Sequence, residues 1–289
     1  MTKKLNLVIK IVLGLFCVLI ISPILVVMFS SLLTEKQLYI IYGNMIEVRM
    51  GIFKLNQTHN IVFSNLAPDF TVKHYIDLFR EEHEILNAYA NSIKVTSAIV
   101  AGNTILSTIT AFVLAKVPFK GSKYIYYMII VLLIIPVQVT LFPNFIVFKE
   151  LNILNNIASV IIPGIFNTFG IFILKQYMNY IPDEYISCSR IDGATYIKSM
   201  YFIVIPMSKP AILTAIVFSL IESWNMIEQP LVFLQDVDKM PLSLFLFNIK
   251  IENIGIGFSA SVLFMLPILV VFLLCKKYLI KGIQLSGIK

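Results

Sequence analysis

Six long apolar runs divide this sequence, and they restrict its fold more than any other feature. The hydrocarbon core of a bilayer is about 30 Å thick, which a helix of about 20 apolar residues can cross. Each run is long enough, or nearly so, to do this. We therefore predict an all-α polytopic membrane protein whose six transmembrane helices lie at Leu7–Ser31, Asn91–Ala115, Ser122–Phe148, Ile157–Leu174, Pro210–Leu234 and Phe258–Lys276.

The composition agrees with burial in lipid. Hydrophobic residues make up 58% of the 289 residues and charged residues only 13%, whereas soluble domains are about half apolar and a quarter charged. The net charge of +7 does not indicate nucleic-acid binding, because the basic residues are scattered between the apolar runs. Membrane lipid is thus a predicted partner, and nucleic acid is not.

The lysine and arginine residues predict the orientation of the chain. Cytoplasmic segments carry an excess of these residues, and the excess is largest here when both termini lie inside the cell. That orientation divides the chain into an N-terminal transmembrane helix at 1–32, an extracytoplasmic loop extension at 33–90 and a membrane core at 91–289. Within the extension, Phe70–Phe79 is predicted to form a short amphipathic helix.

A polar segment at 181–209 falls on the cytoplasmic side between the fourth and fifth spans. Pro182 is suited to opening a short helix, and Asp192-Gly193 supplies turn chemistry, because glycine accepts backbone angles that other residues resist. A second helix is predicted from Ala194 to Ile205. From these residues alone, a docking element and an ordinary amphipathic connector are equally good interpretations.

The same segment resembles the E-A-A loop of binding-protein-dependent ABC importer permeases. That signature reads P-x-E-x-x-E-A-A-x-x-D-G-A, followed after a spacer by I-x-x-P-x-S-x-P. The matching residues here are Pro182, Glu184, Ile191, Asp192, Gly193, Ala194, Ile203, Pro206, Ser208 and Pro210.

Further motifs, in the same order along the chain, resemble the smaller, maltose-type second permease of carbohydrate importers. They are N-S-I at Asn91–Ile93, A-x-x-L-A-K-x-x-F-K-G at Ala111–Gly121, I-P-x-Q-V at Ile135–Val139, F-G-I-F-I-L-K-Q at Phe169–Gln176, S-W-N at Ser223–Asn225 and the closing K-G-I-Q-L-S-G-I-K.

The resemblance implies the type I ABC importer permease fold, with a cytoplasmic coupling helix between spans four and five. It also implies a heterodimer with a second permease, two copies of a cytoplasmic ATPase and an extracytoplasmic solute-binding protein. This chain has no G-x-x-x-x-G-K-[ST] loop, so ATP and Mg are assigned to the ATPase and no cofactor to this chain. The ATPase-coupling residues carried over by resemblance are Glu184, Ser187, Arg190, Asp192, Gly193 and Ala194.

Two positions depart from the family pattern. Ser187-Cys188-Ser189 stands where relatives have Glu-Ala-Ala, so a carboxylate is missing at position 187. Met226 follows Asn225, where relatives often have an acid.

The fifth predicted span contains a carboxylate. A charged group at this depth normally faces a protein interior or a water-filled path. On one continuous helix Glu222, Asn225 and Gln229 share a face, so we assign them to the translocation pathway or a subunit interface. An inter-helix hydrogen bond is the simpler structural alternative.

We therefore predict that the chain is a transport subunit and not an enzyme, and that the importer it belongs to takes up oligosaccharides. A permease for glycerol 3-phosphate or another polyol is the alternative, as is a stand-alone secondary transporter. A membrane enzyme fits worst, because no histidine or cysteine lies beside a carboxylate within a span. Neither the three cysteines nor the three histidines have metal-ligand spacing. The charge of the saccharide stays open.

Overall fold

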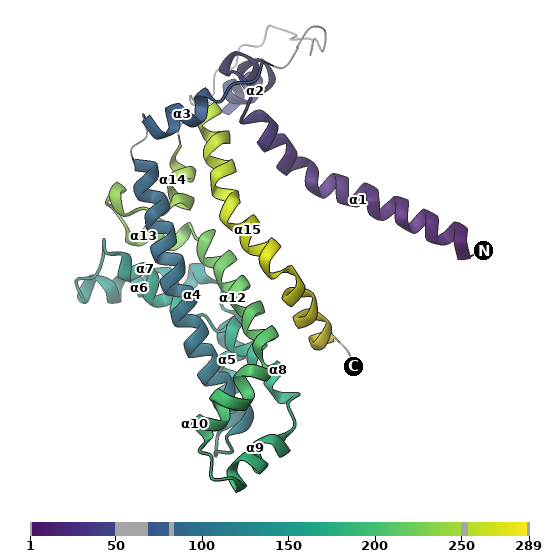
Figure 1. Ribbon diagram of the computed structural model, residues 1–289. Helices are drawn as coiled ribbons and strands as arrows, with labels where there is room; N and C mark the ends of the chain where they lie inside the picture. Colours follow the sequence, from purple (N-terminus) through teal and green to yellow (C-terminus); the bar gives the residue numbers. More distant parts are fainter. Residues whose placement is uncertain (1, 50–68, 81–83, 250–253, 288–289) are drawn as a thin grey trace. The chain divides into compact units, whose positions relative to one another are not determined.

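The computed structural model describes residues 2–49, 69–80, 84–249 and 254–287, and every regular element in that part of the chain is helical (Figure 1). This confirms the all-α prediction for the described residues. The helices are α1 (Thr2–Ser30), α2 (Glu35–Arg49), α3 (Lys73–Arg80), α4 (Glu84–Lys116), α5 (Ser122–Ile134), α6 (Val137–Glu150), α7 (Ile157–Ile165), α8 (Phe169–Asn179), α9 (Asp183–Ile191), α10 (Tyr196–Ser199), the π-helical turn η1 (Met200–Val204), α11 (Ile205–Met207), α12 (Lys209–Trp224), α13 (Glu228–Phe233), the 3₁₀ turn η2 (Val237–Lys239), α14 (Leu242–Asn248) and α15 (Ile254–Gly287).

The chain divides into two compact units. Unit 1 comprises Met1–Ile85 and Asn248–Leu266, and unit 2 comprises Leu86–Phe247 and Pro267–Lys289. Helix α15 contributes its first part to unit 1 and its remainder to unit 2.

In unit 1 the short helix α3 is fastened to the end of α1. The Thr71 amide donates to the Leu32 carbonyl at 2.7 Å, and the Ser31 and Tyr75 hydroxyls are hydrogen-bonded at 2.8 Å. His74 is buried, and its Nε2 lies 2.8 Å from the carbonyl oxygen of Leu33. The helix predicted near Phe70–Phe79 is thus present as Lys73–Arg80. Residues 50–68 of the predicted extension lie outside the described part.

Four described helical segments are long and apolar enough to cross a membrane: Ile9–Ser30, Glu84–Lys116, Ile157–Asn179 and Ile254–Lys276. Two bent helix pairs raise this number to six if each pair is one span. The chain therefore carries four to six candidate spans, and the count of six stays a prediction.

The third predicted span is broken at Pro136. Helices α5 and α6 meet there at 99°. Proline has no N–H for the preceding turn, and it disfavours helical angles at the residue before it. Ile135 accordingly has an extended backbone, with ψ 120°.

The fifth predicted span also differs from the continuous helix expected over Pro210–Leu234. Helix α12 ends at Trp224, and α13 begins only at Glu228. Pro230 has no N–H to donate to the carbonyl of Met226, four residues earlier, so the helical ladder cannot continue there. That carbonyl instead accepts a hydrogen bond from the Ser243 hydroxyl at 2.5 Å.

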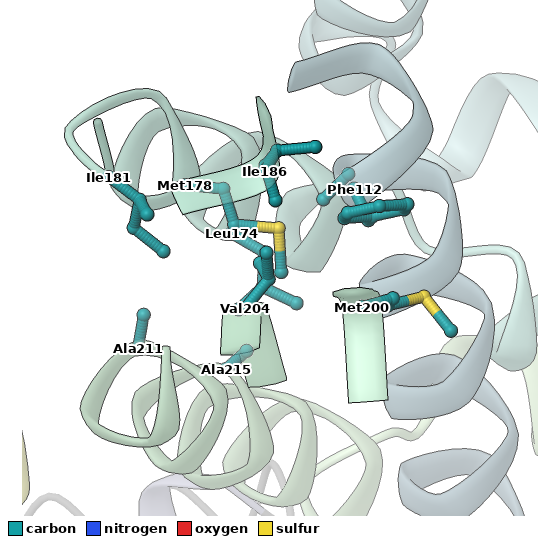
Figure 2. Packing of buried hydrophobic residues seen from close by; sticks show 10 residues of the cluster. Phe112, Leu174, Met178, Ile181, Ile186, Met200, Val204, Ala211 and Ala215 are labelled. Carbon is teal, nitrogen blue, oxygen red and sulfur yellow. The ribbon is translucent and has the colours of Figure 1, made fainter. Parts of the chain in front are cut away.

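One buried apolar cluster of unit 2 packs against α9 and η1 (Figure 2). Phe112 of α4, Met178 of α8 and Ile186 of α9 are all buried there. Val204 of η1 and Ala215 of α12 complete the contact from the other side. Apolar packing therefore joins the polar segment at 181–209 to the helices that precede and follow it.

Candidate functional site

Helix α9 carries the first half of the segment at 181–209. Asp183 and Glu184 occupy its first turn, where negative charge interacts favourably with the helix dipole. Glu184 is exposed, and its carboxylate has no hydrogen-bond or ion-pair partner among the described residues. It is therefore available to a partner chain.

Lys116, the last residue of α4, ties that helix to the start of α9. Its amine donates to the carbonyl of Ile181, and it pairs with Asp183 at 2.6 Å. The Lys116 side chain is only 2% exposed, whereas that of Asp183 is 81% exposed. The amine thus lies under the segment, and only the carboxylate reaches solvent.

The bend after α9 is centred on Gly193. Its φ is +83°, in the left-handed region that favours glycine. Its amide donates to the Arg190 carbonyl at 3.0 Å, and the Ala194 amide donates to the Ser189 carbonyl at 2.9 Å. These two bonds form a Schellman motif, which satisfies the free carbonyls at the helix end. The turn predicted at Asp192-Gly193 is therefore present, as the C-terminal cap of α9.

Side-chain contacts fix the angle between α9 and α10. The hydroxyls of Ser189 and Ser199 are 2.7 Å apart. Arg190 donates to the hydroxyl of Tyr196 at 2.8 Å, and its guanidinium lies 4.6 Å from the centre of that ring. The two helices therefore form one L-shaped element rather than a loose connector.

The second arm differs slightly from the helix predicted between Ala194 and Ile205. It widens into the π-helical turn η1, in which the Ile205 amide bonds to the carbonyl of Met200, five residues earlier. Pro206 explains the widening, because it has no N–H for the carbonyl of Phe202.

The outer surface of the bend combines apolar and acidic groups. Ile191 is 85% exposed and Ile197 is 67% exposed, one on each side of Gly193. Asp192 is exposed between them, and Ala194 is half-buried. Exposed aliphatic side chains of this size are suited to burial against another protein.

Ser187 is exposed on α9, at the position where the E-A-A signature has a glutamate. Its hydroxyl donates to the Asp183 carbonyl at 3.1 Å, within its own helix. The residue therefore offers a partner no charge.

Elsewhere in unit 2, a cavity of about 780 Å³ lies between α5–α8 and α12–α13. Glu222 lines it and accepts a hydrogen bond from the Asn167 amide at 2.8 Å. Gln229 also lines it and is buried, and its Oε1 has no hydrogen-bond partner among the described residues.

Asn225 does not lie with Glu222 and Gln229, the two residues with which it is predicted to share a helix face. Its amide donates to the Ile221 carbonyl at 2.7 Å, at the end of α12. It is not among the cavity-lining residues. Since α12 ends at Trp224, the three residues do not share one helical face. The structure brings Glu222 and Gln229 to the cavity from two separate helices.

No group of three His, Cys, Asp or Glu residues in the described part of the chain is arranged to hold a metal ion. The candidate site consists of a bend with exposed side chains and a mainly apolar cavity that contains a few polar groups.

Residues 103–284 match the family model described as binding-protein-dependent transport system inner membrane component. The chain belongs to this family. The match covers the Gly193 bend and every residue that lines the cavity except Ile99. Its members are transport subunits of ABC importers, so the chain is a permease and not an enzyme.

Two curated relatives resemble this permease over most of its length. It is 27% identical over 222 residues to the arabinooligosaccharides transport system permease protein AraQ of Halalkalibacterium halodurans, covering 76% of this chain and 80% of that protein. It is also 27% identical over 223 residues to the sn-glycerol-3-phosphate transport system permease protein UgpE of Escherichia coli O1:K1 / APEC, covering 76% and 73%.

Two solved structures share the fold of the permease. One is a bacterial ABC transporter involved in the import of the acidic polysaccharide alginate, with a TM-score of 0.77, 22% identity and 96% coverage of both chains. The other is a bacterial alginate ABC transporter in complex with an alginate pentasaccharide-bound periplasmic protein, with a TM-score of 0.57, 16% identity and coverage of 92% and 94%.

Sequence reasoning missed two of the groups that shape these sites. Lys116 appears in the sequence analysis only as part of the motif at Ala111–Gly121 and among the lysines that predict the orientation, and Asn167 is not among the predicted site residues. Their partners are 65 and 55 residues away in the sequence, so no local pattern indicated either contact.

Proposed function

We propose that this permease takes up oligosaccharides as one half of a permease heterodimer, together with two cytoplasmic ATPase subunits and an extracytoplasmic binding protein. The observation that carries the proposal is the hydrogen-bonded bend at Gly193, which exposes aliphatic and acidic side chains. The likeness to AraQ, a permease of an arabinooligosaccharides transport system, supports the choice of substrate.

In this proposal the bend is the coupling helix that docks on the ATPase. Ile191 and Ile197 supply apolar contact, and Glu184 and Asp192 supply carboxylates for basic or backbone donors. Arg190 and Ser187 have intramolecular partners, so their contribution is to hold the element in shape. Gly193 and Ala194 provide the turn.

ATP and Mg belong to the partner ATPase, since this chain has no phosphate-binding loop. Closure of the ATPases would push on the bend. The buried cluster beneath it, with Phe112, Met178 and Ala215, would transmit that movement to α4, α8 and α12. Close-packed side chains transmit displacement because they compress little.

The cavity at Glu222 and Gln229 is this chain's share of the translocation pathway. Within unit 2, α9 and α10 lie at the opposite end from α13 and α14 (Figure 1). The positive-inside rule predicts that both termini of a six-span permease lie in the cytoplasm, which puts the bend on the cytoplasmic side as well. The opposite end of unit 2 then faces the binding protein.

Glycerol 3-phosphate is the second candidate substrate, because UgpE is a permease of an sn-glycerol-3-phosphate transport system. Both candidates require the same partners.

Gentle affinity purification of the tagged permease from native membranes tests the assembly. A second permease and an ATPase are expected to co-purify, and ATP hydrolysis by the complex should rise with loaded binding protein. Recovery of this chain alone, transporting in vesicles without ATP, would overturn the proposal.

A further inference from the structure

We infer that the imported saccharide is uncharged. The inference rests on the proposed role of the cavity as part of the translocation pathway, and it names the class of substrate that the cavity suits. The inference distinguishes between neutral and anionic substrates, and the names of the relatives and structural neighbours include both kinds.

The cavity offers no cation to an acidic substrate. Glu222 is the one ionisable side chain among the described residues that line it, and the lining includes no lysine, arginine or histidine. Whether ionised or protonated, a carboxyl group supplies no positive charge. A uronate or phosphate passing Glu222 would meet a carboxyl group and would gain no counter-charge from the residues that line the cavity.

Two polar side chains of the cavity, Gln229 and Glu222, offer acceptor capacity to a substrate, beside Asn144, Thr168 and Ser219, which can also donate. Gln229 is 9% exposed, and its Oε1 has no partner among the described residues. Glu222 accepts one bond from Asn167, which leaves further lone pairs of its carboxylate open. Sugar hydroxyls can donate to both, whereas an ionised carboxylate or phosphate monoester dianion has no proton to donate.

The rest of the lining suits the apolar faces of a sugar ring. Phe169 and Phe218 lie edge to face, with ring centres 5.2 Å apart, and both line the cavity. Phe166, also in the lining, is 62% exposed. A mainly apolar wall with a few placed polar groups is the usual composition of a site for a small neutral ligand.

Two basic residues of unit 2, Lys123 and Lys175, line a different pocket of about 510 Å³ beside Tyr126, and no acidic residue is among its lining residues. These two cations therefore lie away from the cavity at Glu222.

The complete importer, reconstituted in vesicles with its binding protein, tests the inference. Uptake is measured for neutral pentasaccharides of arabinose, xylose and glucose, for uronate pentasaccharides of equal length, and for glycerol 3-phosphate. At least one neutral sugar should enter tenfold faster than every acid. Comparable or faster uptake of an acid overturns the inference but leaves the importer intact, whereas ATP-independent uptake or no uptake of any of these overturns the proposed function as well.

Two variants test whether the cavity itself selects. Glu222→Gln and Gln229→Met should each slow uptake of the neutral sugar about threefold or more, by weakening or removing an acceptor. Glu228→Gln is the matched control, because Glu228 is exposed, accepts from Gln138 at 2.7 Å and lies outside the cavity lining. Co-purification of the partner chains checks assembly. Unchanged uptake in both assembled cavity variants would also overturn the inference.

Discussion

Two interruptions of helix in unit 2, the bend at Gly193 and the break after Trp224, are specified in different ways. The bend at Gly193 is closed by backbone bonds between residues no more than five positions apart. The break after Trp224 also depends on Ser243, which bonds the Met226 carbonyl from 17 residues away. The first is a local property of the sequence, whereas the second needs the tertiary fold. A change at the first should therefore alter function while the fold survives, and a change at the second should alter stability.

Gly193→Val is expected to have the largest effect. A Cβ at this position meets nothing within 4 Å, so the cost comes only from the positive φ, about 1–3 kcal/mol for a strained backbone. Relief of that strain would change the angle between α9 and α10. We expect transport and substrate-stimulated ATP hydrolysis to fall at least tenfold while the permease stays in the membrane.

Gly121→Val is the matched control for that experiment. Gly121 has a φ of +93° and also has open space around its missing Cβ. It lies in the turn between α4 and α5, outside the α9–α10 bend, although its neighbours Lys120 and Ser122 line a pocket together with Arg190 and Tyr196. The two variants should lose similar thermal stability, and only Gly193→Val should lose coupling. Equal loss of coupling would mean that backbone strain in general, and not the coupling bend, causes the defect.

Ser243→Ala tests the break that depends on tertiary contact. Ser243 is 4% exposed, and its loss leaves the Met226 carbonyl without that partner, at a cost of about 1–3 kcal/mol. The thermal unfolding temperature of the purified permease should fall by several degrees.

Ser159→Ala provides the comparison, because this fully buried hydroxyl bonds the Asn156 carbonyl within its own turn. That carbonyl keeps its bond from the Ser159 amide. A smaller loss of stability is expected, and an equal loss would contradict a special role for Ser243.

The same contrast between local and long-range contacts explains which features of the structure could be predicted from the sequence. Apolar runs and Asp192-Gly193 act over a few residues, so the helical class and the bend could be predicted from them. Pro230 indicates from the sequence that a helix cannot run unbroken past it, because it has no N–H for the Met226 carbonyl. The sequence does not indicate that Ser243 would donate to that carbonyl instead. The contact between Asn167 and Glu222 spans 55 residues and required the packing of α8 against α12.

Lys116→Met tests a long-range contact at the bend, with an intermediate effect. The buried amine bonds the Ile181 carbonyl, so its removal loosens the attachment of α9 to α4. We expect coupling, measured as sugar transported per ATP hydrolysed, to fall about threefold, in keeping with the loss of one hydrogen bond of about 0.5–1.5 kcal/mol.

Asp183→Asn serves as its partner control. The Asp183 side chain is 81% exposed, and an exposed ion pair contributes about 0–1 kcal/mol. Coupling in this variant should stay within twofold of the original. A larger effect from Asp183→Asn than from Lys116→Met would show that the carboxylate contacts the ATPase directly.

Ser187→Glu should have the smallest effect, and it introduces the carboxylate that the E-A-A signature has at this position. An exposed ion pair with the ATPase would contribute about 0.2–1 kcal/mol, which corresponds to a gain of at most about fivefold in coupling. Two neighbours on α9 would also respond, because Glu184 would repel the new charge and Arg190 would attract it, each three residues away.

Ser187→Gln separates these contributions, since it has the same length without the charge. If only the glutamate variant raises coupling, and thermal stability is equal in both, the gain comes from the partner ATPase. If stability changes in step with coupling, the charge acts within α9. An identical result for both variants would place residue 187 outside the docking contact and leave Glu184 and Asp192 as the acidic residues of the bend.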